Sequence, residues 1–145
     1  MVIFRMHASR YQPFDTSGAF LYGGRWHSRW TRVVYAAEHA SLAVLETLIH
    51  AGGRKIPSRL LTQIEIPDSV PMETAAWMEP SASQAFGDAW VEQARSAVLR
   101  VPSVAVNRLE SNFVLNPAHP AFSLIKTLDS AEFVFDPRFY PAAIR

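Results

Sequence analysis

One glutamate stands at the border of an apolar helix face, where a carboxylate is costly. Leu42, Leu45 and Ile49 repeat at intervals of three and four, which predicts a helix over residues 40–50 with these side chains in the core. Glu46 falls at the edge of that face. A buried carboxylate is destabilising unless a cation or hydrogen-bond donors meet it. Glu46 is therefore either a rim residue that reaches water or a reactive carboxylate held in a cleft.

An arginine that follows two glycines is the second candidate for chemistry. In Gly23-Gly24-Arg25-Trp26 the glycines allow the backbone to approach a ligand closely, and the guanidinium of Arg25 is a planar fork that suits phosphate or carboxylate. The segment matches neither the P-loop nor the Rossmann pattern. A glycine turn followed by an ordinary ion-pairing arginine explains it equally well, so the residues alone leave both interpretations open.

Tyr35 and Ser103 are weaker candidates. Tyr35 precedes the predicted helix, and its ring is able to stack on a flat ligand, although a core tyrosine with a satisfied hydroxyl is the commoner outcome. Ser103 is flanked by apolar residues and binds either a ligand or the local backbone. Because the sequence has no Gly-x-Ser-x-Gly motif, a serine-hydrolase role is not supported.

Histidine, cysteine and charge patterns argue against several other functions. The chain has no cysteine, and its histidines include no His-x-x-x-His pair, so we expect no metal site. We expect His27 to lie at the surface. Residues 25–32 combine tryptophan with arginine, as single-stranded nucleic-acid sites do, but a formal net charge of +1 does not supply the basic field that such a site needs.

The length predicts one domain over residues 1–145. Because predicted strands outnumber helices and few strand–helix–strand units are regularly spaced, the pattern favours an α+β domain with a mixed, mostly antiparallel sheet and flanking helices over a doubly wound parallel sheet. The predicted strands are 1–6, 31–35, 60–66, 101–106, 112–115 and 131–135, the predicted helices are 40–50 and 85–100, the second with Ser83 as N-cap, and 10–24 is predicted as loop. No apolar run reaches the ~18 residues of a membrane span, and the first residues lack a signal peptide. We therefore expect a cytoplasmic protein with no membrane partner.

Seven short motifs occur along the chain in a fixed order. They are Phe4-Arg5, Gly23-Gly24-Arg25-Trp26, Val33-Val34-Tyr35-Ala36-Ala37-Glu38, Leu42-Ala43-Val44-Leu45-Glu46, Val101-Pro102-Ser103, Asn116-Pro117-Ala118-His119-Pro120 and Phe135-Asp136-Pro137-Arg138. Each motif is weak alone, whereas their joint presence in this order is specific. Together they resemble the RES domain, a family named for an arginine, a glutamate and a serine, over nearly the whole chain.

The resemblance implies a set of site residues. The expected catalytic residues are Arg25, Glu46 and Ser103, and the expected substrate-binding residues are Arg5, Arg25, Tyr35, Trp26 and Asn116. The family usually has an asparagine after Arg-Trp and a glycine a few residues later, where this chain has His27 and Trp30. We therefore expect the local turn to differ, while all three eponymous residues are present.

The resemblance also implies a fold like that of ADP-ribosyltransferases and a toxin of a type II toxin–antitoxin system that depletes NAD. The implied reaction cleaves the nicotinamide–ribose bond by hydrolysis or phosphorolysis, with NAD as substrate and with no true cofactor or metal. The implied partner is a helix-turn-helix antitoxin that covers the active site. Alternatives are a mono-ADP-ribosyltransferase acting on a protein, a non-catalytic nucleotide-binding module and, least favoured, a nucleic-acid-binding protein.

Each site residue has an expected role in that reaction. Glu46 would stabilise the positive charge that develops on the ribose. Arg25 and Arg5 would bind the pyrophosphate, unless Arg25 pairs with Glu46 in the empty site. Tyr35 would stack on the nicotinamide ring, and Ser103 would hydrogen-bond the carboxamide or a ribose hydroxyl. No residue identifies the acceptor, which is water, phosphate or a protein side chain.

Overall fold

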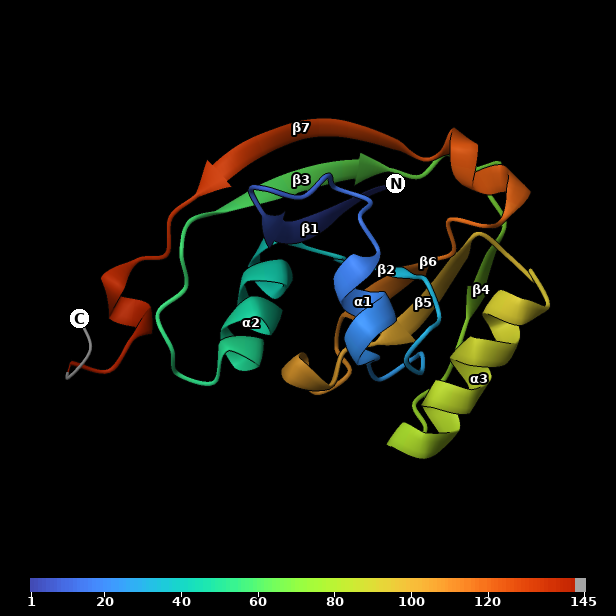
Figure 1. The fold of residues 1–145 in the computed structure, drawn as a ribbon, viewed down its shortest axis with the longest axis horizontal. Helices are drawn as coiled ribbons and strands as arrows, with labels where there is room; N and C mark the ends of the chain where they lie inside the picture. The colour runs from blue at the N-terminus through green and yellow to red at the C-terminus, as the bar shows by residue number, and fades with distance from the viewer. Residues whose placement is uncertain (143–145) are drawn as a thin grey trace.

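The computed structural model describes residues 1–142, which form a seven-stranded sheet with helices around it (Figure 1). The strands are β1 (Val2–Ala8), β2 (Val34–Ala37), β3 (Arg59–Glu65), β4 (Met72–Thr74), β5 (Val98–Pro102), β6 (Ser111–Leu115) and β7 (Lys126–Phe133). The helices are α1 (Ser17–Tyr22), α2 (Ala40–Ala51) and α3 (Pro80–Glu92), and the short 3₁₀ turns are η1 (Val104–Val106), η2 (Pro120–Leu124) and η3 (Pro137–Phe139).

The strand order β4-β5-β6-β2-β1-β3-β7 brings together segments that are distant in sequence. Neighbouring strands are antiparallel except β4 and β5, which are parallel. Strand β2 lies between β1 and β6, with Tyr35 opposite Val114 and Ala37 opposite Asn112. The predicted α+β class with a mixed, mostly antiparallel sheet is therefore confirmed.

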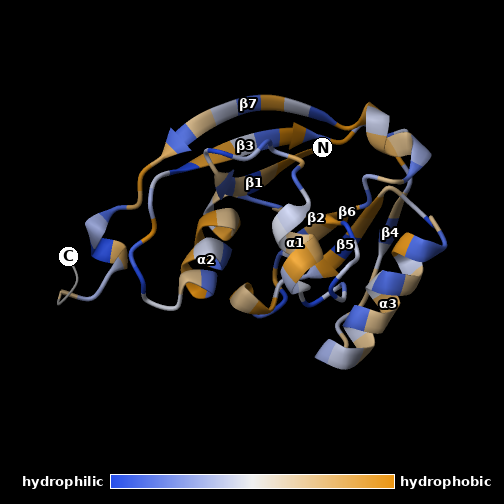
Figure 2. Cartoon of the chain, viewed as in Figure 1, coloured by the Kyte–Doolittle hydropathy of each residue, from blue (hydrophilic) through white to orange (hydrophobic). Residues whose placement is uncertain are grey.

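Apolar side chains cover both faces of the central strands. Ile3 and Phe113 belong to a core cluster on one face, and Trp90, Leu99 and Val114 belong to a second cluster on the other face. Phe113 and Val114 are successive residues of β6, so the alternation of side chains along a strand places them on opposite faces. Figure 2 shows β2, β5 and β6 as mostly hydrophobic, whereas hydrophilic residues interrupt the edge strand β7.

Helix α2 packs against β1, β2 and η1. Its residues Leu42, Ala43 and Val44 are buried, and the helix ends at Gly52, whose left-handed conformation (φ 60°) suits a glycine. The predicted helix is confirmed, but one expectation about its core face is wrong. Ile49 is 56% exposed, because that side of the last turn opens onto a cavity instead of packing against the sheet.

Helix α3 lies earlier in the chain than the sequence predicts. It spans Pro80–Glu92, whereas the apolar stripe predicts 85–100, and Ser83 lies inside the helix instead of capping it. Ala94 adopts a left-handed conformation with φ of +50°, which ends the helical run, and β5 begins at Val98. The apolar residues after the helix are buried in the sheet, so their periodicity reflects core position and not helix.

Several other element boundaries also differ from prediction. The predicted loop 10–24 contains α1; the predicted strand 31–35 lies at 34–37; the predicted strand 101–106 ends at Pro102, where η1 follows; the predicted strand 131–135 is the end of the longer β7; and β4 is not predicted at all. The predicted strands 1–6, 60–66 and 112–115 match β1, β3 and β6 within two residues. The sheet interior is thus better predicted than its edges, where pairing with a neighbour decides the limits of a strand.

Candidate active site

A cavity of about 690 Å³ opens between α1, α2 and the middle of the sheet. Pockets of about 300–1,000 Å³ are typical of small-molecule sites. Arg5, Arg25, Tyr35, Glu46 and Asn112 all line this cavity, although they come from segments far apart in the sequence. The cavity is therefore the candidate active site.

Glu46 projects from α2 into this cavity with one carboxylate oxygen held. Its Oε1 accepts a hydrogen bond from Ser103 Oγ at 2.9 Å and another from Asn112 Nδ2 at 2.9 Å. Within residues 1–142, Oε2 accepts no hydrogen bond. The carboxylate is therefore oriented from one side, and its second oxygen remains available to a ligand.

Ser103 reaches Glu46 from the loop that joins β5 to β6. The backbone of this loop is fixed, because Ser103 donates its N–H to the carbonyl of Glu110, and Arg108 donates to the carbonyl of Ser103 at 2.7 Å. The Ser103 side chain is buried, at 1% exposure, and it does not line the cavity. In this arrangement the Ser103 hydroxyl donates to Glu46 and supports its carboxylate, while a contact between Ser103 and the substrate stays a prediction.

Asn112 is a site residue that the sequence reasoning missed. It lies on β6, opposite Ala37 of β2 and Val101 of β5, and its amide donates to Glu46. The signal available in the sequence is a polar residue inside an otherwise apolar predicted strand. That signal is insufficient alone, because the register of three strands decides which side chain Asn112 faces.

Arg25 is a cation of the cavity wall that has no protein partner within residues 1–142. Its side chain is exposed and, across the described part of the chain, forms no hydrogen bond or ion pair. Pairing of Arg25 with Glu46, one of the two expected arrangements, is therefore not seen. A guanidinium without a protein partner at a cavity wall is suited to bind an anionic group of a ligand.

Helix α3 holds the loop that carries Arg25. Ser83 Oγ donates to the carbonyl of Arg25 at 2.6 Å, and Gln84 Nε2 donates to the carbonyls of Gly24 at 3.2 Å and His27 at 3.1 Å.

One turn further along α3, Asp88 Oδ1 accepts the backbone N–H of Ser28 at 2.8 Å, and Asp88 Oδ2 accepts the hydroxyl of the same serine. One face of α3 thus fixes the backbone on both sides of Arg25.

Half-buried Tyr35 and buried His27 form a hydrogen-bonded pair. His27 Nε2 lies 2.7 Å from the carbonyl of Ala19, which only accepts, so Nε2 carries the proton. With the proton on Nε2, Nδ1 accepts a hydrogen bond from the Tyr35 hydroxyl at 2.7 Å. The backbone N–H of Trp26 donates to the same hydroxyl. Burial, the largest cause, raises the pKa of Tyr35 above its usual value, so this hydroxyl stays protonated. The expectation that His27 lies at the surface is wrong, because it is 1% exposed.

Arg5 is largely occupied by the protein itself. Its Nε donates to the carbonyl of Pro13 at 2.6 Å, Nη1 to the carbonyl of Tyr35 at 2.8 Å, and Nη2 to that of Asp15 at 3.4 Å. Burial lowers the pKa of Arg5 to about 10, an effect that the nearby Asp15 carboxylate partly opposes. Arg5 therefore joins the 13–15 loop to β2, and little of its guanidinium remains for a ligand.

The other expected binding residues, Trp26 and Asn116, are buried. Trp26 is 3% exposed and packs in the cluster with Trp90 and Val114, although part of it borders the cavity. Asn116 is 1% exposed, accepts the N–H of Ala118 at 3.1 Å and does not line the cavity. The structure thus gathers Arg25, Glu46 and Tyr35 around the cavity, and leaves Asn116 outside it.

Trp30 occupies a position where the RES domain family usually has glycine, and its backbone conformation explains that preference. Its φ of +75° lies in the left-handed region, which glycine adopts without strain. The nearby arginines are occupied within the protein: Arg29 lies over the Trp30 ring and Arg32 over the Phe20 ring, each within 5 Å of the ring centroid. Both arginines therefore contact aromatic rings of the protein, while the Trp30 side chain itself is 62% exposed.

Metal ligation and membrane insertion are two further properties on which the described residues bear. Over residues 1–142, no cluster of three or more His, Cys, Asp or Glu side chains has the arrangement of a metal site. Of the helices that the structure describes, none is long and apolar enough to cross a membrane.

The model of the RES domain matches residues 2–136 of this sequence. Because the match covers most of the chain, the protein belongs to the RES domain family. The family resemblance carried by the seven motifs is therefore confirmed.

Several curated proteins of similar length are related to this chain. A protein named Prs ADP-ribosylating toxin, from Sphingobium sp. (strain YBL2), is 39% identical over 146 residues, which cover 90% of each chain. A protein named Toxin Res, from Photorhabdus laumondii, is 34% identical over 98% of this chain and 99% of its own. Another Toxin Res, from Yersinia enterocolitica, is 34% identical over 95% of this chain and 99% of its own.

A solved structure has the same fold. The crystal structure of the M. tuberculosis MbcT–MbcA toxin–antitoxin complex contains a chain that superposes with a TM-score of 0.77 over 91% of this chain and 83% of that one. The two sequences are 15% identical. At this identity the likeness concerns the fold alone, and it agrees with the α+β architecture described above.

Proposed function

We propose that this chain is a toxin of a toxin–antitoxin system that cleaves the nicotinamide–ribose bond of NAD in the cavity beside Glu46. The observation that carries the proposal is a carboxylate with one oxygen fixed and the other free, in a cavity that also contains an unpaired arginine. The names of the curated relatives support a toxin that uses an ADP-ribosyl donor.

In the proposed reaction the bond between the ribose C1′ and the nicotinamide nitrogen breaks, and its electron pair leaves with neutral nicotinamide. Positive charge develops on the sugar, and the free Oε2 of Glu46 stabilises it by electrostatics and by hydrogen bonding to a ribose hydroxyl. The oxygen of the acceptor then adds to C1′ and loses its proton. Ser103 and Asn112 keep the carboxylate in place during these steps.

Arg25 is the residue we assign to the pyrophosphate of NAD. Its guanidinium is exposed and unpaired, whereas Arg5 already donates to three backbone carbonyls. The backbone around Arg25 is held by α3, so the side chain is presented from a fixed base. Tyr35 contributes its ring to the cavity wall, where it is available to stack on nicotinamide.

A second candidate function is transfer of ADP-ribose to a protein. It is favoured by one observation: the 39% identical relative is named an ADP-ribosylating toxin of Prs. Bond cleavage in the cavity is common to both reactions, and they differ only in the acceptor. A non-catalytic module that binds NAD is the third possibility that an experiment must separate.

The first experiment follows free nicotinamide from NAD, with and without phosphate and with and without Prs. We expect release by the wild type, a loss of about 10²–10³-fold in Glu46→Gln, and normal release by the matched control Glu132→Gln on β7. The sugar product identifies water or phosphate as acceptor, and label on Prs identifies protein transfer. NAD binding without nicotinamide release would disprove the proposed cleavage.

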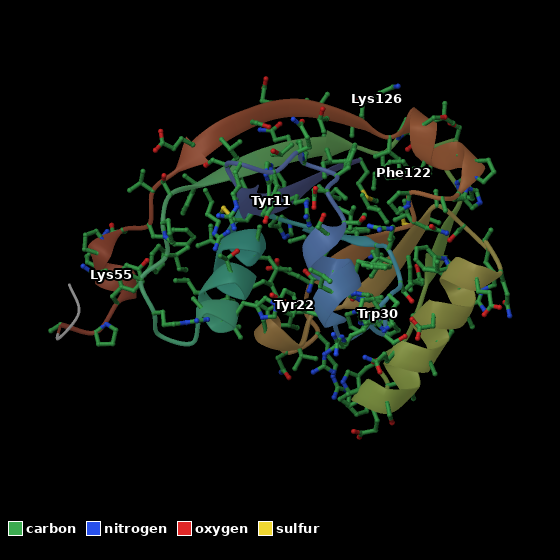
Figure 3. All side chains as sticks on the ribbon, in the orientation of Figure 1. Tyr11, Tyr22, Trp30, Lys55, Phe122 and Lys126 are labelled. Atoms are coloured by element: carbon green, nitrogen blue, oxygen red, sulfur yellow. The ribbon has the colours of Figure 1, made fainter. Side chains whose placement is uncertain are left out.

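We also propose a helix-turn-helix antitoxin as the partner that covers the cavity. Tyr22 and Ile49 line the cavity and are 81% and 56% exposed, so they form an apolar rim that suits a protein partner. Tyr22 lies at the end of α1 that faces α2 in Figure 3. Expression of the chain in bacteria should arrest growth, co-expression of the antitoxin should restore it, and Tyr22→Asp with Ile49→Asp should weaken that rescue. Since NAD is in the cytoplasm, we place the action there.

A further inference from the structure

We infer that Asn112 is a positioning residue that holds one oxygen of the Glu46 carboxylate and directs the other, Oε2, toward the substrate. This inference rests on the proposed function of the same cavity. It starts from the two hydrogen bonds that converge on a single oxygen, Oε1, from Ser103 and Asn112. One donor is a hydroxyl and the other is an amide, and this chemical difference gives the two residues different roles.

Asn112 is matched to a charged carboxylate. A side-chain NH₂ group only donates, so its bond to Oε1 is strongest when Glu46 is ionised. The hydroxyl of Ser103 both donates and accepts, so it is compatible with the ionised and with the protonated acid. Asn112 is therefore the partner that discriminates between the two forms.

The two donors also differ in the element that carries them. Asn112 lies within β6 and is paired on both sides, with Ala37 of β2 and with Val101 of β5. Ser103 instead follows the end of β5, at the start of a loop in which Asn107 and Arg108 both have left-handed backbones. A group held by the centre of a sheet is positioned more accurately than one held by a loop.

Asn112 also contributes to the wall of the cavity. Asn112 lines the cavity, and within residues 1–142 its Oδ1 forms no hydrogen bond and is not among the buried atoms that lack a partner. The free Oε2 of Glu46 and the free Oδ1 of Asn112 therefore occur on neighbouring side chains of one wall. Orientation of Glu46 by Asn112 should affect the bond-breaking step more than the binding of NAD.

The first test compares kcat and KM for nicotinamide release. Asn112→Leu keeps the approximate size but removes the donor, and we expect kcat to fall about tenfold with little change in KM. The control Gln63→Leu removes an amide from β3, outside the cavity, and should leave both constants unchanged. A normal kcat in Asn112→Leu would overturn the inference.

The second test is the pH profile of Asn112→Asp. This variant replaces the amide that donates to Glu46 Oε1 by a second carboxylate, and two adjacent carboxylates each disfavour the ionised form of the other. We expect the acid side of the activity profile to move to higher pH, with activity recovering in alkaline solution. A merely structural residue would lower activity equally at all pH values, and that outcome also contradicts the positioning role.

A third measurement does not depend on turnover. In NMR spectra of the free protein, the side-chain amide signals of Asn112 should shift in Glu46→Gln by more than those of Asn107 and Asn116. Identical Asn112 signals in both proteins would overturn the inference. If the wild type releases no nicotinamide while the signals shift as expected, the proposed function fails and the positioning of Glu46 by Asn112 stands.

Discussion

Gly87 of α3 lies against the carbonyl oxygen of Trp26, so close that a Cβ atom at Gly87 would be 1.7 Å from that oxygen. Glycine is disfavoured inside a helix, but here the absence of a side chain lets α3 approach the loop that carries Arg25. The hydrogen bonds from Ser83 and to Asp88 are formed on either side of this contact.

Gly87→Ala should therefore destabilise the protein, by about 1–3 kcal/mol in the free energy of unfolding, since the methyl group meets backbone that cannot rotate away. Denaturant unfolding measures this value. The matched control is Gly18→Ala in α1, where nothing lies within 4 Å of the added Cβ and a small stabilisation is expected. Equal stability of Gly87→Ala and the wild type would show that the loop is free to move from α3.

Arg5 and Arg25 should respond differently to replacement by lysine. Arg5→Lys loses the planar fork that bonds three carbonyls, so unfolding free energy should fall by about 1–3 kcal/mol. Arg25→Lys should change stability by no more than ~0.5 kcal/mol, because Arg25 is exposed and has no partner in the described chain, but it should raise KM for NAD. Thermal melts and initial rates on both variants separate these roles. A stable Arg5→Lys with a raised KM, together with a destabilised Arg25→Lys, would contradict both assignments.

Trp30 should show the strain of its left-handed backbone when two small residues are compared there. Trp30→Gly and Trp30→Ala both remove the ring and its contact with Phe20, so their difference isolates the φ of +75°. We expect the glycine variant to be the more stable by about 1 kcal/mol, although glycine is normally the less stable choice. Parallel unfolding curves decide this, and a more stable alanine variant would contradict it.

His7 should make the protein less stable in mild acid. Burial, the largest cause, lowers the pKa of His7 below its usual 6.5, and its Nε2 lies 2.7 Å from Thr62 Oγ1 in the sheet interior. The unfolded chain then binds more protons than the folded one below about pH 6.5, so the unfolding free energy falls as the pH drops through that range. Chemical unfolding between pH 7.5 and 5 measures the slope. His7→Gln should flatten it, whereas His50→Gln, which replaces an exposed histidine, should not.

The sequence predicts those parts of the fold that depend on local periodicity. The short apolar runs of β1, β3 and β6 and the apolar repeat of α2 place these four elements nearly correctly. The end of α3 was not predictable in this way, since the turn at Ala94 interrupts an apolar stripe that continues into a strand. Side-chain burial is common to both elements, so hydrophobicity alone does not separate them.

The residues of the candidate site fall into the same two groups, those suggested by the local sequence and those placed by contacts between distant segments. Glu46 and Arg25 are suggested by their residue types and immediate neighbours, and the family motifs strengthen the weaker candidates Ser103 and Tyr35. Asn112 and the polar face of α3 owe their places to strand register and to packing between distant segments. Such non-local relations leave no periodic trace in a single sequence.

Because the loop that carries Arg25 is attached to α3, the position of Arg25 depends on residues that lie outside the cavity. No residue of α3, all of which the structure describes, lines the cavity, yet α3 holds the backbone of the arginine loop through Ser83, Gln84 and Asp88. A small molecule wedged between α3 and this loop would misplace the guanidinium without entering the cavity. Inhibition of this kind would reduce the fraction of competent protein, and a large excess of substrate would only partly reverse it.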